Sequence, residues 1–418
     1  MIQKNHALSI FYQYSFATAV FFKMVFFVGT LYYITVIQMD PLQLVLVGTA
    51  MEASIFIFEI PTGVIADVYS RRLSVIIGVF LMGVGFFLIG LWPRFYTVII
   101  AQIIWGAGYT FTSGAAQAWI SDEIGEENAG QAFMKATQLE QFGGMLGLGL
   151  SLWLAAYRIN LPILLGGVLF FPLGFYLIAF MPETAFKKVD LKHWQGWKRF
   201  TGTFQNGVKM IHRRPVLLVI LVVGTLIGLY SEGFDRLWMK HLLESFSLPR
   251  LPLLPLAGDP EYINTLLWLG IISFVGMALT SLASGAAQRW VARPGTQPLV
   301  QGLFAAVVLL TICLFAFSLS TLLGFLLIFY WLIGILRTVI NPLYTAWVNH
   351  RLDSEVRATV LSMSSQVDAI GQIMGGPLVG VVARAVSVKT GLLLTSSMLV
   401  PLIPILGNQL RKNGGEED

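Results

Sequence analysis

Unbroken apolar segments recur along the whole chain, separated by short polar stretches. A helix needs about 20 apolar residues to cross the hydrocarbon core of a bilayer, and most of these segments reach that length. Their apolar residues are consecutive and do not alternate with polar ones, which excludes membrane-spanning strands. Twelve membrane-spanning helices are therefore expected, at approximately residues 8–37, 42–66, 73–92, 95–120, 132–157, 161–181, 215–239, 263–285, 297–319, 321–348, 356–386 and 388–408.

The composition agrees with an integral membrane protein. Hydrophobic residues make up 56% of the 418 residues and charged residues only 12%, whereas a soluble domain contains about 25% charged residues. A soluble chain with this composition could not cover its own surface, so the excess apolar surface has to face lipid. The first apolar segment is too long for the core of a signal peptide and is expected to remain as a span. The single cysteine, Cys313, excludes a disulfide framework.

Lysine and arginine residues concentrate in the loops on one side of the predicted spans. When twelve spans are counted, Arg71, Arg72, the stretch 187–214 and Arg411 all fall on the side of the N-terminus. Basic residues close to spans mark cytoplasmic loops. Both termini are therefore predicted to be cytoplasmic, with the protein in the plasma (inner) membrane. The same loops account for the net charge of +5 without a nucleic-acid partner.

A long polar stretch near the middle divides the chain into two halves. It predicts an N-terminal six-helix bundle over residues 1–186, a cytoplasmic linker over 187–214 and a C-terminal six-helix bundle with a cytoplasmic tail over 215–418. Within the linker, aromatic and aliphatic residues recur every three or four positions, with lysine and arginine between them. This pattern predicts an amphipathic helix that lies on the membrane surface.

The two halves resemble each other in sequence. A shift of 228 residues pairs Gly106 with Gly334, Gln138 with Gln366, Glu140 with Asp368, Gly143 with Gly371, and Gly147 with Gly375. Duplicated six-helix halves are typical of secondary transporters, whose binding site lies between the repeats near the middle of the membrane.

The loop between the second and third predicted spans carries the most specific motif. It reads Glu-Ile-Pro-Thr-Gly-Val-Ile-Ala-Asp-Val-Tyr-Ser-Arg-Arg over residues 59–72. Together with residues 231–238, 357–363 and 371–377, this segment resembles the major facilitator superfamily, and most closely its drug:proton antiporter branch, which includes macrolide-efflux-like proteins. The resemblance covers essentially the whole chain. It implies an all-α membrane protein with twelve transmembrane helices in two pseudo-symmetric six-helix bundles, working by alternating access.

The resemblance also implies a cytoplasmic gate. In the family, this motif latches the two halves together on the cytoplasmic side, and the role is carried here to Gly63, Asp67, Arg71 and Arg72. Gly63 is expected to allow close helix packing, and Asp67 to accept hydrogen bonds from a neighbouring helix N-terminus. The alternative is an arginine pair that only determines topology. The expected acidic partners of the two arginines include Asp122, Glu123 and Glu126.

Some positions depart from the family pattern. Val68 and Ser70 stand where Arg and Gly are common, and Gln102 stands where the proton-coupling motif has Arg. Residues 143–149 are rich in glycine but lack the Gly-Pro of the antiporter motif. These departures leave the route of proton coupling open.

Charged residues within the apolar segments are the candidates for a transport site. Each would cost about 2.5–3.5 kcal/mol at the bilayer centre if it faced lipid, so these residues must pair or line a wet cavity. They are Lys23, Glu52, Glu59, Glu140, Glu232, Asp235, Arg236, Arg337 and Asp368.

Depth along the spans sorts these charges, because a helix rises 1.5 Å per residue. Our hypothesis places Lys23, Glu52, Glu140 and Asp368 around a central cavity, where the carboxylates bind protons or a cationic substrate. The alternative is a structural ion pair between Lys23 and Glu52. Gln138, Gln366, Asn341 and Gln117 could orient a ligand or join helices. Most aromatics are expected to face lipid or the core, but some could line an apolar pocket, and the candidates are Phe11, Tyr12, Tyr14, Phe21, Phe22, Trp105, Tyr109, Tyr344 and Trp347. Glu232, Asp235 and Arg236, near the outer end, are predicted to form an outer gate.

The sequence contains neither a phosphate-binding Walker motif nor a recognisable nucleophile–base or metal-binding constellation. We therefore expect no enzyme activity, no cofactor and no metal. The predicted function is proton-coupled export of an amphipathic drug-like compound or metabolite by a monomer in the lipid bilayer. Alternatives are another cargo (siderophore export, lysophospholipid flipping or solute uptake) and a transport-inactive membrane sensor or scaffold.

Overall fold

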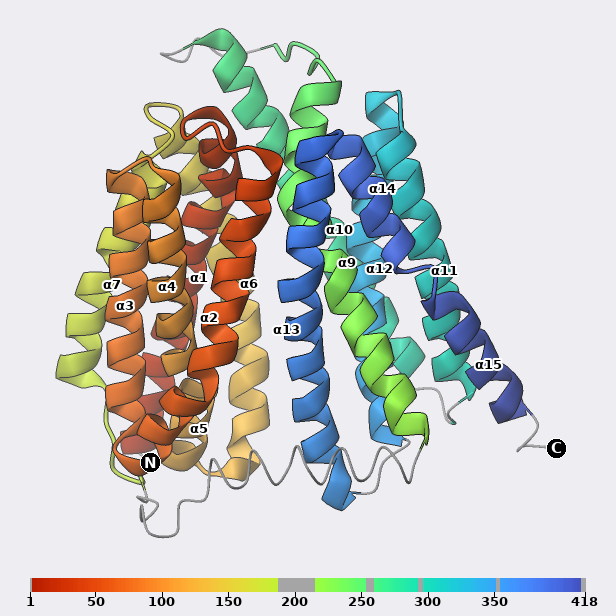
Figure 1. Ribbon diagram of the computed structural model, residues 1–418. Coiled ribbons are helices and arrows are strands. Elements are labelled where there is room, and N and C mark those ends of the chain that lie inside the picture. The colour runs from red at the N-terminus through yellow and green to blue at the C-terminus, as the bar shows by residue number, and fades with distance from the viewer. Residues whose placement is uncertain are drawn as a thin grey trace. The chain divides into compact units, whose positions relative to one another are not determined.

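The computed structural model describes residues 2–186, 215–252, 259–291, 295, 297–350 and 354–414. These residues form helices joined by short loops, and they contain no strand (Figure 1). The helices are α1 (Ile2–Thr35), α2 (Pro41–Val68), α3 (Arg71–Leu91), α4 (Phe95–Thr112), α5 (Ala115–Ile124), α6 (Glu126–Ala155), α7 (Leu161–Phe180), α9 (Pro215–Ser245), α10 (Pro260–Val291), α11 (Gln297–Leu319), α12 (Leu323–His350), α13 (Ser354–Ala385), α14 (Val388–Met398) and α15 (Leu402–Gly414).

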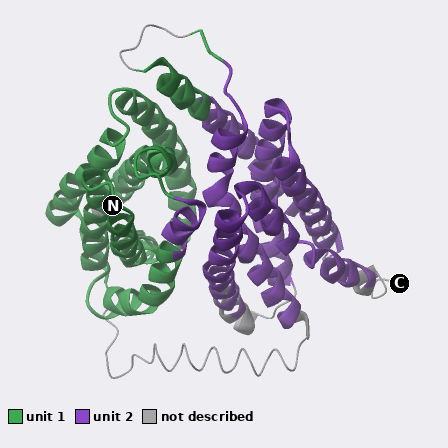
Figure 2. Cartoon of the chain, turned by 45° about the horizontal axis from the view of Figure 1, so that its top comes forward, with its two compact units in different colours: residues 1–39, 50–196, 250–270 green, residues 40–49, 197–249, 271–418 purple. Residues whose placement is uncertain are grey.

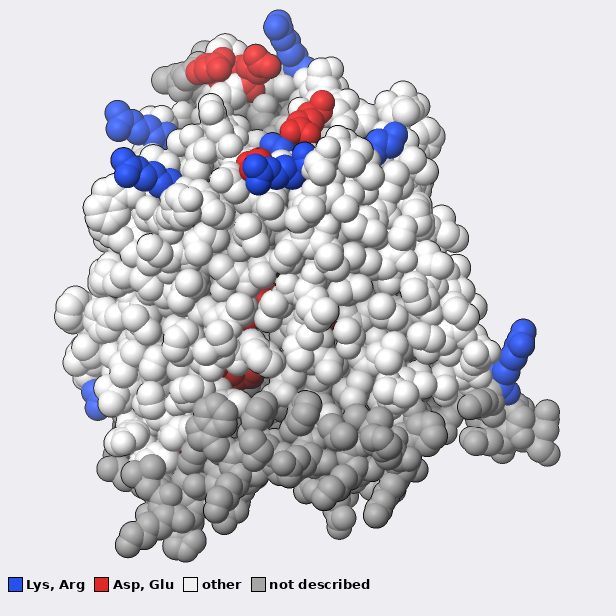
Figure 3. Space-filling model, in the orientation of Figure 1, with Lys and Arg blue, Asp and Glu red and all other residues white. Residues whose placement is uncertain are grey.

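The all-helical fold and the twelve expected spans are confirmed. Each span corresponds to one helix or to two consecutive helices, and nine stretches of the described chain are long and apolar enough to cross a membrane by themselves. On the face shown in Figure 3, charged side chains lie mainly near helix ends, with a wide uncharged surface between them. Helices α6 and α13, which carry Glu140 and Asp368, are not among the nine stretches. Their sequences are less uniformly apolar than those of the nine stretches.

Two expected spans are interrupted. The span predicted over 95–120 divides into α4 and α5, because Ser113 is extended and Gly114 adopts a positive φ of 72°. The span predicted over 388–408 divides into α14 and α15 on either side of residues 399–401. Pro401 lies in that second break, where its missing N–H and its ring oppose a continuous helix.

Contacts between helices divide the chain into two compact units (Figure 2). Unit 1 contains residues 1–39, 50–196 and 250–270, and unit 2 contains residues 40–49, 197–249 and 271–418. The start of α2 therefore belongs to unit 2, and the start of α10 belongs to unit 1. The linker predicted over 187–214 lies outside the described residues, and the predicted bundle boundaries stay a prediction.

Within unit 1, α1 packs against α6 through closely approaching backbones. An alanine at Gly143 would place its Cβ 2.7 Å from the carbonyl oxygen of Phe16. One turn later, an alanine at Gly147 would place its Cβ 2.5 Å from the carbonyl oxygen of Val20. Only glycine fits such contacts without a shift of the backbone.

Unit 2 repeats this arrangement between α9 and α13. Gly371 and Gly375, the counterparts of Gly143 and Gly147, abut the carbonyl groups of Thr225 and Leu229 so closely that neither position has room for a Cβ. The two glycines are again one turn apart, and so are the two carbonyl groups. The sequence repeat is therefore matched by equivalent helix packing inside each unit.

Candidate functional site

Unit 1 contains a partly open cavity of about 310 Å³ between α1, α4, α5 and α6. Helix α1 contributes Phe11, Tyr14, Ser15, Thr18 and Phe22, which recur every three or four residues and so share one face of the helix. The remaining lining residues are Tyr109, Thr112, Ser113, Gly114, Ala116, Gln117, Phe133, Ala136, Thr137 and Glu140.

The cavity combines one acidic group with hydroxyl groups and aromatic rings. Among the described residues that line it, Glu140 is the one charged side chain and Gln117 is the one amide. Tyr14, Thr112 and Tyr109 line the cavity together with Glu140, and the Thr112 hydroxyl group donates to the carbonyl oxygen of Tyr109 at 2.9 Å. A ligand here would meet a single negative charge beside several groups able to donate hydrogen bonds.

An aromatic cluster supports the apolar side of the cavity. Phe22 meets the ring of Trp105 edge-on, with 6.1 Å between the ring centroids, and that of Phe86 edge-on at 5.8 Å. Tyr109 stacks on Trp105 at 5.9 Å. These ring contacts hold the lining side chains of α1 and α4 in defined positions.

The break between α4 and α5 opens directly onto the cavity. Ser113 and Gly114, the two residues outside both helices, are lining residues. Backbone that leaves the helical conformation at membrane depth is tolerated where it lines a cavity, and transporters commonly bind substrates at such discontinuous helices. The sequence carried a signal for this break, because Ser-Gly within an apolar run is a turn dipeptide, yet the span was expected to be continuous.

Gly114→Ala is expected to destabilise the protein by about 1–2 kcal/mol, because a side chain disfavours the positive φ at this position. A Cβ there would have open space around it, so strain and not collision is the cause. The measurement is the thermal unfolding midpoint of purified protein in detergent. Gly130→Ala, at an exposed helical glycine of α6 with equal space, is the control. Equal midpoints for the two variants would contradict the expectation.

The other residues predicted for a central site lie in different places. Glu140 lines the cavity, but Lys23, Glu52 and Gln138 are not among its described lining residues. Lys23 is half-buried in α1 beside Gly147, and Gln138 is exposed. The structure therefore brings one of the four predicted central charges into this cavity.

Asp368 and Gln366 belong to unit 2, where both are half-buried on α13. Asp368 accepts a hydrogen bond from the Gln372 amide at 2.9 Å. On α12, the Tyr344 hydroxyl group donates to the carbonyl oxygen of Ile220 at 2.8 Å and contacts the Ser364 hydroxyl group at 2.6 Å.

The predicted outer-gate residues form two separate ion pairs in unit 2. Glu232, which is buried, pairs with Arg236 one turn later at 2.7 Å. Asp235 pairs instead with Arg337 of α12, through two hydrogen bonds of 2.5 and 2.8 Å. The sequence had marked Arg337 as an intramembrane charge without a named partner, because only the tertiary structure shows which faces of α9 and α12 meet.

Glu232 is enclosed by neighbouring glycines. Its carboxylate and the Arg236 guanidinium occupy the space that a side chain at Gly48, near the start of α2, would need. An alanine at Gly376 would place its Cβ 3.1 Å from the Cγ of Glu232. Small residues on α2 and α13 thus create room for this ion pair.

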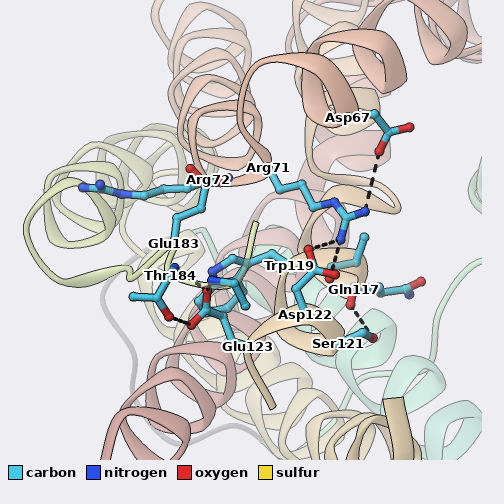
Figure 4. Close-up of polar contacts among 12 residues, drawn as sticks. Asp67, Arg71, Arg72, Gln117, Trp119, Ser121, Asp122, Glu123, Glu183 and Thr184 are labelled. Atoms are coloured by element: carbon cyan, nitrogen blue, oxygen red, sulfur yellow. Dashed lines mark hydrogen bonds and ion pairs between the residues drawn. The ribbon is translucent and has the colours of Figure 1, made fainter. Parts of the chain in front are cut away.

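The loop motif organises a second polar cluster in unit 1 (Figure 4). Arg71, at the start of α3, pairs with Asp122 of α5, as expected, and donates to the carbonyl oxygen of Ala118 at 2.9 Å. It also lies 3.8 Å from Asp67, one turn earlier. Arg71 therefore ties the end of α2 and the start of α3 to α5.

Arg72 and Glu123 have other partners than those expected. The backbone N–H of Arg72 donates to Glu183 at 3.0 Å, and the Arg72 side chain donates to the carbonyl oxygen of Ile178. Glu123 accepts hydrogen bonds from the N–H and hydroxyl groups of Thr184 at 2.6 and 2.7 Å. These contacts secure the segment that follows α7.

Two further observations concern Gly63 and Ser70 of the motif. A Cβ at Gly63 would have no atom of the described chain within 4 Å, so the expected close packing is not found there. Ser70, which replaces the family's glycine, caps α3 by accepting a hydrogen bond from the Leu73 N–H at 2.9 Å. Its hydroxyl group donates to Glu183 at 2.6 Å, which places a negative charge at the N-terminus of α3, where the helix dipole favours it.

Comparisons with known proteins agree with this fold. A family model described as Major Facilitator Superfamily matches residues 14–406. An uncharacterized MFS-type transporter of Bacillus subtilis (strain 168), YxaM, is 26% identical over 417 residues, covering 96% of this chain and 94% of YxaM.

Solved structures of similar fold have lower sequence identity. The nucleoside transporter NupG has a TM-score of 0.73 at 14% identity, covering 98% of this chain and 99% of that one. A bacterial homologue of the human lysosomal transporter Spinster has a TM-score of 0.74 at 12% identity, covering 98% and 97%. At these identities the likeness shows the fold alone. The fold, the motif and the family model together lead to one assignment: this chain is a multi-pass membrane transporter, not an enzyme, and it belongs to the major facilitator superfamily.

Proposed function

We propose that this protein is a secondary active transporter that exports an amphipathic, positively charged small molecule in exchange for protons, by alternating access. The single observation that carries this proposal is the unit 1 cavity, in which Glu140 is the one charged group among aromatic rings and hydroxyl groups. The export direction rests on the resemblance to the drug:proton antiporter branch.

The residues that line the cavity favour the binding of a cation that also carries apolar groups. Phe11, Phe22 and Phe133 offer apolar and aromatic surface, and the faces of aromatic rings attract cations. Glu140 offers the compensating negative charge. The cavity volume of about 310 Å³ is at the lower end of the range for small-molecule sites, which is about 300–1,000 Å³.

Exchange of substrate for protons follows if both bind to the same carboxylate group. Glu140 can hold either a proton or the cationic group of a substrate, and each excludes the other. A gradient that delivers protons to Glu140 from one side of the membrane would displace the substrate on that side. Such competition couples two fluxes without any direct contact between the two ligands.

The test uses purified full-length protein in proteoliposomes with an imposed pH gradient. Tetraphenylphosphonium, an aromatic cation, is the first probe, beside ethidium, an anionic dye and a nucleoside. We expect gradient-driven movement of the cations, and a loss of about tenfold or more in Glu140→Gln, because contacts to a charged group contribute about 1.5–3 kcal/mol. Glu126→Gln, at an exposed acid in the first turn of the same helix, is the matched control.

Three outcomes would contradict the proposal. Unchanged cation transport and pH dependence in Glu140→Gln would remove Glu140 from the site. Movement of the anion alone would contradict the charge preference. Movement of any probe that needs no pH gradient would favour a different energy source or lipid flipping.

A polar solute is the second candidate, because the cavity offers many hydrogen-bonding groups. Besides the two tyrosines and Gln117, five lining residues carry hydroxyl groups: Ser15, Thr18, Thr112, Ser113 and Thr137. NupG, which shares the fold, is a nucleoside transporter. Transport of the nucleoside, with no transport of either cation, would select this candidate.

A further inference from the structure

We propose that the substrate of this transporter is a zwitterion: its cationic centre binds at Glu140, and a carboxylate or similar anionic oxygen group binds at the N-terminus of α5. The inference rests on the proposed function and adds the second half of the substrate. The compound is compact, because both of its charged groups bind in one cavity of about 310 Å³.

Helix α5 begins at the cavity. Its first turn contributes Ala116 and Gln117 to the lining, directly after the helix break. The first N–H groups of a helix have no partner within it, and the capping residue here is Gly114, which has no side chain to supply one. The two residues of the break accept hydrogen bonds from the N–H groups of Ala115 and Ala118. Within the described chain, neither accepts one from Ala116 or Gln117, so these two N–H groups are available to a ligand.

This end of α5 also carries the positive end of a helix dipole. The helix has ten residues, and no acidic side chain lies in its first turn to compensate the dipole. A Cβ at Gly114 would have no atom of the described chain within 4 Å, so protein atoms leave room beside this turn. Free N–H groups and an uncompensated dipole together favour the binding of an anion.

The hydroxyl groups of the lining give an independent indication of an oxygen acceptor. Those of Thr18, Thr112 and Thr137 donate to carbonyl oxygens of their own helices, at 2.8, 2.9 and 3.0 Å. Those of Ser15 and Ser113 have no hydrogen-bond partner within the described chain. Ser15 is only 3% exposed. A hydroxyl group buried without a partner is costly, and an acceptor bound in the cavity would remove this cost.

The lining face of α1, which carries Ser15, meets both α5 and α6. The ring of Phe11, one turn before Ser15, contacts Trp119 of α5 and Phe133 of α6, with 6.5 and 6.1 Å between the ring centroids. Ser15 therefore lies on the side of α1 that adjoins the helix N-terminus of α5 and the helix that carries Glu140.

The two charged groups of the ligand would bind at similar depths. Gly114 precedes the end of α5 at Ile124 by ten positions, about 15 Å along the helix axis. Glu140 follows the start of α6 at Glu126 by fourteen positions, about 21 Å along its axis. Since α5 and α6 are joined by Gly125 alone, the difference in depth is only about 6 Å.

The charges of the cavity favour a zwitterion over a simple anion. Glu140 is the one charged side chain in the described lining, and it repels an anion that brings no cation with it. A zwitterion carries its own counter-charge, so its anionic group can bind at the N-terminus of α5 while its cationic centre compensates Glu140.

The first measurement compares two aromatic cations that differ by one carboxylate. Benzyltrimethylammonium carries only the cation, and (4-carboxybenzyl)trimethylammonium carries a carboxylate on the opposite side of the same ring. Binding to purified full-length protein in detergent is measured by equilibrium dialysis at neutral pH. We expect the zwitterion to bind about tenfold more tightly, because its carboxylate gains charge-assisted hydrogen bonds from the first turn of α5 and from Ser15.

Gln117→Glu tests the anion site without weakening the helix. A glutamate in the first turn stabilises a helix, so the variant should fold at least as well as the wild type, yet its charge should repel the ligand carboxylate. We expect the zwitterion to lose its tenfold advantage and the simple cation to bind more tightly. Gln131→Glu, at an exposed position of α6 outside the described lining, is the matched control and should keep the preference. Ser15→Ala should weaken binding of the zwitterion more than that of the simple cation.

Equal affinities of the two probes for the wild-type protein would overturn the inference, and so would a preference for the zwitterion that persists in Gln117→Glu. Glu140→Gln should weaken the binding of both probes. Preference for the zwitterion without movement of either probe in a pH gradient would contradict the proposed function alone. Gradient-driven transport of benzyltrimethylammonium without that preference would overturn the inference alone. Binding of neither probe would contradict both.

Discussion

Gly147→Ala is expected to lower the stability of the folded protein by about 2 kcal/mol or more, although alanine is the better helix former. The added Cβ would lie 2.5 Å from the carbonyl oxygen of Val20 and 2.9 Å from the Cβ of Lys23. The first of these atoms is backbone and cannot rotate away, so α1 and α6 would have to separate. The thermal unfolding midpoint in detergent and the yield of monodisperse protein measure the effect.

The same helix offers a matched control. Gly149 is exposed and has no atom within 4 Å of an added Cβ, so Gly149→Ala should leave the midpoint unchanged or raise it slightly. Gly375→Ala in unit 2 should reproduce the loss, because its Cβ would collide with the backbone of Leu229. Similar midpoints for Gly147→Ala and Gly149→Ala would show that the α1–α6 contact is looser than described.

Glu123→Ala is expected to destabilise unit 1 by about 3 kcal/mol. Glu123 is 8% exposed and accepts three hydrogen bonds, from the N–H and hydroxyl groups of Thr184 and from the N–H of Ala185 at 3.0 Å. Hydrogen bonds to a charged group contribute about 1.5–3 kcal/mol each and are not additive. The segment after α7 should then exchange its amide hydrogens faster, which mass spectrometry of peptides covering residues 182–186 would detect.

Glu126→Ala is the control for this prediction. Glu126 is the exposed first residue of α6, three positions along the chain, and it was an expected partner of the arginine pair together with Glu123. Its replacement should change stability by less than about 0.5 kcal/mol. If both variants unfold at the same temperature, the hydrogen bonds of Glu123 do not hold the segment after α7.

Part of the candidate site could be predicted from the chain alone. Glu140 was singled out because a carboxylate inside an apolar run must be compensated or hydrated, and the structure places it in the unit 1 cavity. The pairing of Arg71 with Asp122 was likewise expected from an arginine and an acid at adjacent span ends. The same reasoning chose Lys23 and Glu52, which do not line that cavity, because depth in the membrane does not tell which way a side chain points.

The ion-pair partners of the charged residues on α9 could not be predicted in full from the sequence. Depth near the outer end of the span put Glu232, Asp235 and Arg236 into one group, and the spacing of four residues predicted a local pair between Glu232 and Arg236. The structure retains the local pair and gives Asp235 to Arg337, about a hundred residues away in sequence. Likewise, Ser113 and Gly114 were placed inside a continuous span, although the backbone there turns out of the helix beside the cavity.

The sequence by itself determined the class of protein, the number of spans and the duplication, because bilayer thickness and the cost of exposing polar backbone to lipid act on each segment separately. Only the tertiary structure decided where α4 breaks, which residues enclose the cavity and which acid holds Arg337. Those features depend on the rotation of each helix about its axis and on its register against its neighbours, and no single segment of the chain encodes either.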